Sequence, residues 1–408
     1  MYPNFKNMKS KILLIAFLIF LCLSSIAQTL EQLVPITTSL TMSKLVYADN
    51  AIRLSIERKE IPGAVLAIVQ HGKMAYLKAY GNKQNYPCAE PMEINTVFDL
   101  ASCTKPLATA ISVMILIEKG LIGLNDNVSS YLPGFSNFAV GNEEKQIKIL
   151  HLLTHTSGLP AYAPVSSLEK QFGSLPPPQI LMQYINSCKR GFEPGTNMQY
   201  SCLNYITLQH IIETVSGRGL RDFCKENIFD VLNMKHTDFN PSDELKMSCA
   251  PTEKQKNGSV LKGVVHDPLA RILNEGVSGN AGLFSDANDL GILVAALMNG
   301  GELNGKRILS PLSVNLMSTL PESLKSFGRT PGWDMSSAYS SCKGDLLGPN
   351  TYCHTGYTGT SVVIDPDNDI AIILLTNRVH PLDKGSIAKL RSSVANAVAG
   401  SITDRKAL

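Results

Sequence analysis

The sequence predicts an α+β fold in which both ends of the chain build one antiparallel sheet, helices flank it, and an all-helical domain is inserted. Apolar runs separated by turn residues predict two β-hairpins, at residues 63–81 and 360–376, near opposite ends of the chain. Helical patterns and loops rich in Pro and Gly dominate residues 126–259. We therefore predict a sheet domain of residues 28–125 and 260–408 around an inserted helical domain of residues 126–259.

The strands and helices of the predicted sheet domain follow from local patterns. Strand-forming residues 64–69 and 73–80 flank a His71-Gly72 turn, and residues 360–364 and 370–376 flank an Asp- and Pro-rich turn. Apolar residues at helical spacing predict a helix before the first hairpin and another after the second. Their stripes are Leu45, Ile52 and Ile56 in the first case and Ile387, Leu390, Val394 and Val398 in the second.

The first residues have the pattern of an export signal. Lys6, Lys9 and Lys11 precede an unbroken apolar run at residues 12–23, which is short for a membrane span, and the small residues Ser25 and Ala27 follow. We predict that residues 1–27 are a signal peptide, with an uncleaved anchor as the alternative. The mature protein is then periplasmic or secreted, and it touches the membrane only through the signal peptide before cleavage.

Composition and charge exclude some classes of partner. The chain has 408 residues, 44% of them hydrophobic, and a formal net charge of +3. The predicted signal carries three lysines and no acid, so the mature chain is close to neutral. Because no basic block with interleaved aromatic residues occurs, we expect no nucleic-acid partner.

One of five Ser-x-x-Lys patterns stands in the context of a catalytic nucleophile. Ser102 and Lys105 open a long apolar helix, and Pro106 fits only its first turn. The spacing of three places Ser102 and Lys105 on one face, and the helix start offers amide donors to a developing oxyanion. We expect burial to lower the pKa of Lys105 so that it can accept the serine proton. The other four patterns, at Ser167, Ser259, Ser340 and Ser386, lack this context.

Two later segments offer partners to this serine. Tyr200, held near Lys105, can shuttle a proton to a leaving group, although a tyrosine alone is usually a packing residue. His354-Thr355-Gly356 precedes a β-branched strand, where Gly356 permits close approach of a substrate backbone. The amide of Tyr357 is a candidate second oxyanion donor. Standing alone, the triplet would be a turn with a surface histidine.

Together these motifs resemble the serine β-lactamase and penicillin-binding-protein-like hydrolases, particularly the class C branch of β-lactamases, D-alanyl-D-alanine carboxypeptidases and esterases. The resemblance covers nearly all of the mature chain and implies a β-lactamase/transpeptidase-like fold. It rests on residues 98–105, 149–160, 194–196 with 200–201, 281–285 and 354–356.

The resemblance implies a role for each matching residue. Ser102 is acylated, Lys105 and Tyr200 handle protons, and His354 stands where the third motif usually has lysine. The oxyanion donors are the amides of Ser102 and Tyr357. Substrate-binding residues are expected at Cys202, Thr355, Gly356 and Trp333, with ordinary packing as the alternative for Trp333. No cofactor and no metal is implied: His151 and His155 are spaced four apart, but the HExxH glutamate is missing.

The sequence departs from the family pattern at two positions. Cys202 replaces the usual Asn of the second motif, and a thiol is poor at accepting from a lysine and at holding a substrate amide. Asn204 is expected to point elsewhere on a continuing helix. His354 is mostly uncharged at neutral pH unless a carboxylate raises its pKa, so recognition of a substrate carboxylate would be weaker and pH-dependent.

The cysteines allow two interpretations. Eight remain after signal cleavage, and Cys103, Cys202 and Cys353 lie in or beside the motifs. They are either buried small apolar residues or, in an exported protein, disulfides or redox-sensitive thiols near the site.

The motifs together predict an exported serine hydrolase that forms an acyl-enzyme at Ser102. Its substrate would be a D-amino-acid peptide of the peptidoglycan type or a small ester. A β-lactamase is the alternative within the same class. A catalytically weak protein that binds penicillin or cell-wall fragments is the alternative from another class. The sequence leaves the oligomeric state open.

Overall fold

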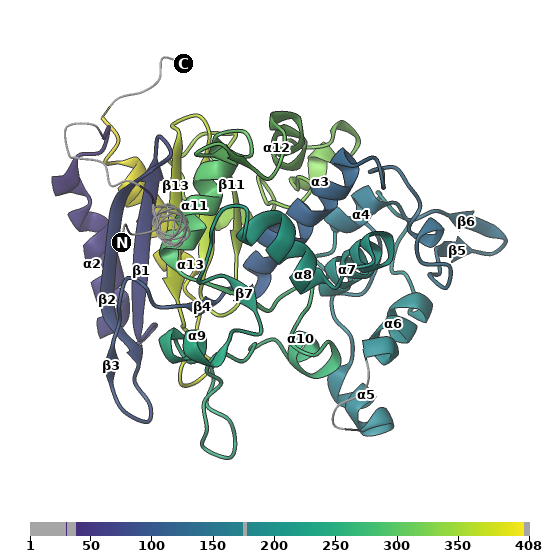
Figure 1. Cartoon of the computed structure of the whole chain (residues 1–408), viewed down its shortest axis with the longest axis horizontal. Coiled ribbons are helices and arrows are strands. Elements are labelled where there is room, and N and C mark those ends of the chain that lie inside the picture. The colour runs from purple at the N-terminus through teal and green to yellow at the C-terminus, as the bar shows by residue number, and fades with distance from the viewer. Residues whose placement is uncertain (1–29, 31–37, 174–177, 404–408) are drawn as a thin grey trace, which may run out of the picture.

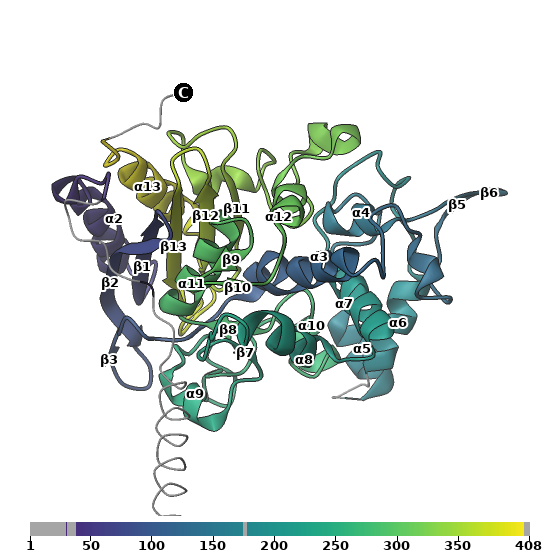
Figure 2. The ribbon, with the colours of Figure 1, turned by 45° about the horizontal axis from the view of Figure 1, so that its top comes forward.

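The computed structural model describes residue 30, residues 38–173 and residues 178–403 of the chain. The predicted signal peptide, residues 1–27, lies outside these described residues. Figures 1 and 2 show the main sheet toward one side of the molecule and helices α4 to α7 toward the other.

The main sheet has six antiparallel strands in the order β11-β12-β13-β1-β2-β3. Strand β1 lies beside β13 from the other end of the chain, with Ala64 opposite Thr376 and Gln70 opposite Ile370. This pairing confirms the predicted α+β fold with a sheet built from both chain ends. The strands are β1 (Gly63–Gln70), β2 (Lys73–Gln84), β3 (Glu90–Pro91), β11 (Tyr352–Thr355), β12 (Ser361–Asp365) and β13 (Ile370–Thr376).

Both faces of this sheet are buried, which explains the continuous apolar run of β1. Val65 and Val69 point into the larger core, whereas Leu66 and Ile68 pack into a second core on the opposite face. Helix α11 contributes to the larger core, and helices α2 and α13 to the second. These helices are α2 (Val46–Glu57), α11 (Ala287–Met298) and α13 (Ala388–Ala399).

The segment between the hairpins is mainly helical, although it also carries short strands. A hairpin of β5 and β6 lies within it, and β7 joins β4 and β8 in a three-stranded sheet. The helices are α4 (Ile149–Leu153), α5 (Val165–Phe172), α6 (Pro178–Ser187), α7 (Cys202–Ser216), α8 (Leu220–Cys224), α9 (Asp243–Ser248), α10 (Pro268–Leu273) and α12 (Pro311–Ser318). The short strands are β4 (Phe98–Asp99), β5 (Phe138–Val140), β6 (Glu143–Lys145), β7 (Asp238–Phe239), β8 (Leu283–Ser285), β9 (Glu302–Leu303) and β10 (Lys306–Arg307).

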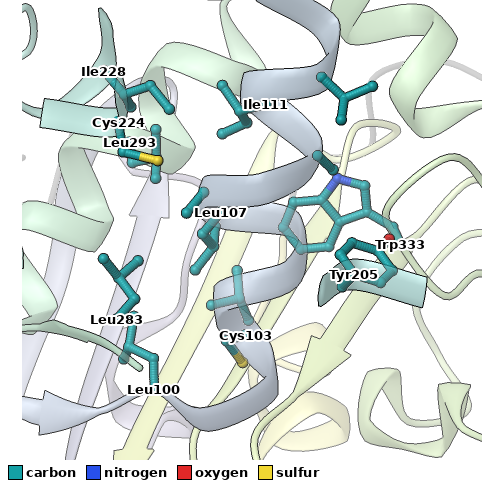
Figure 3. Packing of buried hydrophobic residues seen from close by; sticks show 14 of the residues in the cluster. Leu100, Cys103, Leu107, Ile111, Tyr205, Cys224, Ile228, Leu283, Leu293 and Trp333 are labelled. Carbon is teal, nitrogen blue, oxygen red and sulfur yellow. The ribbon is translucent and has the colours of Figure 1, made fainter. Parts of the chain in front are cut away.

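A central helical run, Ala101–Glu118, joins the two sides of the molecule. It begins with a 3₁₀ turn, continues through a π-helical stretch over Lys105–Ala110, and ends as α3 (Ile111–Glu118). The run is long and apolar enough to cross a membrane, but 83% of it is buried inside the protein. Figure 3 shows its side chains Leu107 and Ile111 within the hydrophobic core. The run therefore places Ser102, in its first turn, on a rigid scaffold.

Candidate active site

The backbone immediately before Ser102 adopts a strained conformation. Ala101 has φ +46°, a left-handed value that non-glycine residues rarely adopt. Its amide donates to Asp99 Oδ1 at 2.9 Å, and the other oxygen of that carboxylate accepts from the amide of His266 at 2.7 Å. This sharp turn between β4 and the central helix leaves the Ser102 side chain half-buried at the edge of a cavity.

Lys105 lies directly behind the candidate nucleophile. Its Nζ donates to Ser102 Oγ at 3.1 Å and to the carbonyl oxygen of Asn280 at 2.9 Å, and it lies 3.7 Å from Cys202 Sγ. The side chain is fully buried. The structure therefore brings the first motif and Cys202 of the second motif around one nitrogen atom.

The pKa of Lys105 departs from the sequence-based expectation. Burial acts to lower this pKa, but Cys202, Tyr200 and Asp267 outweigh it and raise the pKa above the usual 10.5. Burial also raises the pKa of the Tyr200 phenol and the Cys202 thiol. The expectation of a lowered lysine pKa was wrong because the sequence does not show which groups surround the side chain. At neutral pH the lysine holds its proton.

Tyr200 completes the cluster from the second motif. Lys105 Nζ lies 5.0 Å from the centre of the Tyr200 ring, and both Lys105 and Ser102 act to lower the phenol pKa against the effect of burial. The ring packs against His155 at 4.4 Å and Tyr339 at 5.3 Å between centroids. These contacts fix Tyr200 beside Ser102 and Lys105.

His354 is buried and carries no charge in this environment. Burial, Arg329 and Lys105 hold its pKa well below the usual 6.5. Its Nδ1 faces the carbonyl oxygen of Thr355 at 3.0 Å, and its Nε2 is buried without a hydrogen-bond partner. His354 therefore does not supply the cation that a lysine would supply at the same place.

A tight turn carries the predicted second oxyanion donor. The amide of Gly356 donates to the carbonyl of Thr360 at 2.8 Å, and the Thr360 hydroxyl donates to the carbonyl of Leu100 at 2.9 Å. This turn is therefore tied to the backbone that leads into Ser102. Among the described residues, the Tyr357 N–H has no hydrogen-bond acceptor. It is available to a ligand in the cavity beside Ser102.

The cavity at Ser102 has a volume of about 270 Å³. It brings together residues predicted from all three motifs, and it adds arginines that the sequence motifs did not reveal. Its lining includes Ser102, Tyr200, His354, Thr355, Gly356 and Tyr357, together with Arg329, Asp334, Tyr339, Arg378, Gly385, Ser386, Ile387 and Arg391.

Two of these arginines have carboxylate partners. Arg329 forms an ion pair with Asp334 at 3.0 Å, and Arg378 forms one with Asp383 at 3.0 Å. Arg391 instead donates to backbone carbonyls. None of the three belongs to the three catalytic motifs, and their positions in the fold bring them to the cavity.

One predicted substrate-binding residue lies elsewhere. Trp333 does not line the cavity but is buried in the larger core (Figure 3). Its ring packs against Tyr352 at 5.3 Å between centroids. Its large apolar surface explains this position, and the prediction that it contacts substrate is corrected. Cys202, which was also expected to bind substrate, begins helix α7. Its thiol faces Lys105, and the residue does not line the cavity.

Asn204 and His155 support the site from behind. As expected, Asn204 points away from Lys105: its Oδ1 accepts a hydrogen bond from Ser157, and its Nδ2 lies 3.1 Å from His155 Nδ1. The same His155 nitrogen faces the amide of Ser201 at 3.1 Å. His151 Nδ1 accepts from the amide of Lys148 at the start of α4. The eight cysteines of the described residues are free thiols, and five of them are buried.

Comparison with known proteins agrees with this geometry. The family model described as Beta-lactamase matches residues 48–396. The chain is 31% identical over 371 residues to an N-acetylmuramyl-L-alanine amidase of Bacillus subtilis, covering 84% of this chain and 83% of that protein. It is 30% identical over 401 residues to a putative D-alanyl-D-alanine carboxypeptidase of Escherichia coli K12, covering 91% and 92%.

A solved structure shares the fold over almost its whole length. EstCE1, described as a hydrolase with promiscuous acyltransferase activity, superposes with a TM-score of 0.70 at 25% identity, covering 88% of this chain and 99% of that one. The family match, the two relatives and the shared fold lead to one conclusion. The chain belongs to the Beta-lactamase family.

Proposed function

We propose that the protein is an exported serine hydrolase that forms an acyl-enzyme at Ser102. The observation that carries this proposal is the 3.1 Å contact between Lys105 Nζ and Ser102 Oγ, with Tyr200 packed beside both. A buried lysine, a phenol and a serine at the start of a helix form a nucleophile with adjacent proton acceptors. The cell-wall enzymes among the relatives support an exported location.

The proposed reaction needs one base in the Lys105–Tyr200 pair. With both groups protonated, neither accepts the serine proton, so the pair must first lose one proton to solvent. Ser102 Oγ then attacks the substrate carbonyl while its proton passes to the pair. The negative oxygen is held by the amides of Ser102 and Tyr357. The pair returns the proton to the leaving group as the bond to it breaks, and water releases the acyl group by the reverse sequence.

The proposed substrates are D-amino-acid peptides of the peptidoglycan type, with small esters as a second candidate. The carboxypeptidase and amidase relatives support the peptides, and the guanidinium groups lining the cavity favour a substrate with a free carboxylate. The uncharged His354 and the thiol of Cys202 favour small esters, which need neither a cation nor an amide partner.

Intact mass after incubation with a fluorophosphonate or with a penicillin tests the proposal. We expect a covalent adduct on the wild type that is absent in Ser102→Ala. No adduct from either reagent would overturn the serine mechanism. A persistent penicilloyl adduct without turnover of any substrate would indicate a binding protein, and fast penicillin hydrolysis a β-lactamase. A panel of D-Ala-D-Ala peptides, a chromogenic cephalosporin and short-chain p-nitrophenyl esters distinguishes the substrate classes.

A further inference from the structure

Arg391 holds the turn that carries the Tyr357 amide. It reaches over from the C-terminal helix α13, and its Nη2 donates to the carbonyl oxygens of Gly356 at 2.7 Å and Thr360 at 2.9 Å. These two residues begin and end the turn. Because the side chain also lines the cavity at Ser102, its charge lies next to the reacting atoms rather than at a distant surface.

The charge of Arg391 is not neutralised by a neighbouring acid. No carboxylate of the described chain lies within ion-pair distance of it, whereas Arg329 and Arg378, in the same cavity, are both paired. Its Nε is buried without a hydrogen-bond partner. Burial lowers the pKa of Arg391, yet a guanidinium keeps its proton in proteins. Arg391 is half-buried, and a guanidinium that has no acid partner and a buried, unbonded Nε is costly for the fold, which points to a role in the site.

The carbonyl that Arg391 contacts belongs to the same peptide group as the oxyanion donor. The C=O of Gly356 and the N–H of Tyr357 share one amide, so a charged donor on the oxygen makes the N–H a stronger donor on the other side. The amide of Gly359 also donates to this oxygen, at 3.1 Å. The Tyr357 N–H itself is free to meet a ligand.

From this geometry we propose that Arg391 is a positioning residue that polarises the Gly356–Tyr357 peptide and so strengthens the oxyanion site of the hydrolase. The inference rests on the proposed acyl-enzyme function. It assigns to a residue of the C-terminal helix a contribution that acts through the peptide group and not through contact with the reacting atoms. An arginine that bound a substrate carboxylate directly would act only on anionic substrates, whereas a polarised amide acts on every acyl substrate.

The test uses p-nitrophenyl acetate, a neutral ester without a carboxylate, and phenylboronic acid, which forms a tetrahedral adduct on the serine. We expect Arg391→Gln to lower kcat/KM for the ester by about tenfold to a hundredfold, and to weaken boronate inhibition by a similar factor. Arg391→Lys keeps the charge but reaches only one of the two carbonyls. We therefore expect its kcat/KM and its inhibition by the boronate to lie between those of the wild type and Arg391→Gln. If the Gln variant does not fold, the comparison of Arg391→Lys with the wild type carries the test.

Arg190→Gln is the matched structural control. Arg190 is buried and, like Arg391, donates to backbone carbonyls, among them that of Ile185 at 3.0 Å, but it lies outside the cavity. We expect this variant to melt at a lower temperature without a change in boronate inhibition. Unchanged ester hydrolysis in a folded Arg391→Gln, or a loss confined to carboxylate substrates, would overturn the proposal. Full activity of Ser102→Ala would instead overturn the proposed function itself.

Discussion

Lys105 Nζ lies 3.1 Å from Ser102 Oγ, and the lysine side chain has no exposed surface. The lysine is therefore shielded from solvent. A second hydrogen bond, to the carbonyl of Asn280 at 2.9 Å, holds its Nζ in place. Because burying an ammonium group is costly, packing alone does not explain why a lysine stands here, and its contact with Ser102 points to a role in the reaction.

Replacing Lys105 by methionine should abolish most of the activity while keeping the shape of the side chain. We expect acylation of Ser102 by a fluorophosphonate to slow by about a hundredfold to ten-thousandfold, because the proton acceptor is lost. Lys170→Met is the matched control, since Lys170 belongs to another Ser-x-x-Lys pattern, on helix α5 and outside the cavity. Equal acylation rates in the two variants would contradict the assignment.

The raised pKa of Lys105 also predicts the direction of the pH dependence. The Lys105–Tyr200 pair holds both protons at neutral pH and becomes a base only after losing one. We expect kcat/KM for a neutral ester to rise as the pH increases from neutral into the alkaline range. A rate that stays constant over this range would show that the lysine is already uncharged at neutral pH, as the sequence alone had suggested.

The site could be predicted from the sequence where its chemistry is local. Ser102 and Lys105 are three residues apart, and a helix start brings them together by its own geometry. Strands β1, β2, β12 and β13 could be predicted equally well, because turn residues separate their apolar runs, whereas β3 and β11 were not predicted. The pairing of β1 with β13 joins the two chain ends, and the predicted hairpins at both ends anticipated it.

The rest of the site depends on contacts between distant segments. Arg391 reaches Gly356 across 35 residues, and the carbonyl of Asn280 lies 175 residues from Lys105 along the chain. No local pattern distinguishes these residues from any other arginine or asparagine. Trp333 shows the converse: the family resemblance of its segment suggested a substrate contact, but its large side chain fills the core.

Cys202→Asn should improve the hydrolysis of amide substrates. The thiol lies 3.7 Å from Lys105 Nζ, and an amide at this position can accept from the lysine while donating to a substrate carbonyl. One added hydrogen bond to substrate is worth about tenfold in kcat/KM for a D-Ala-D-Ala peptide. Cys202→Ser, which is smaller and carries a hydroxyl in place of the amide, is the control. No gain in the Asn variant would show that the thiol is not what limits peptide turnover.

Burial of a neutral His354 predicts how stability depends on pH. The unfolded chain binds a proton at this histidine below its ordinary pKa of 6.5, whereas the folded chain does not until much lower pH. Stability contributed by His354 is therefore present above pH 6.5 and is lost as the pH falls, by about 1.4 kcal/mol per pH unit. His354→Gln should reduce this slope in urea unfolding between pH 6.5 and 4.5, and identical slopes would contradict the assignment.

Gly356→Ala should damage both the turn and the activity. A Cβ atom there would overlap the Thr360 hydroxyl oxygen and the Leu100 carbonyl oxygen, at distances that real Cβ atoms do not reach. The Thr360 hydroxyl also donates a hydrogen bond to the Leu100 carbonyl, so the added methyl group forces the turn away from the backbone before Ser102. We expect a loss of about 1–3 kcal/mol in the free energy of unfolding and a fall in kcat in the molecules that remain folded.

Gly219→Ala provides the comparison for this substitution, because no atom lies within 4 Å of a Cβ built there. It should leave both the urea midpoint and ester hydrolysis close to those of the wild type. If Gly356→Ala kept wild-type kcat at reduced stability, the turn would be a structural element only. The Tyr357 amide would then not be an oxyanion donor. A joint loss of stability and kcat is the result that the contacts of the turn with Leu100, Thr360 and Arg391 require.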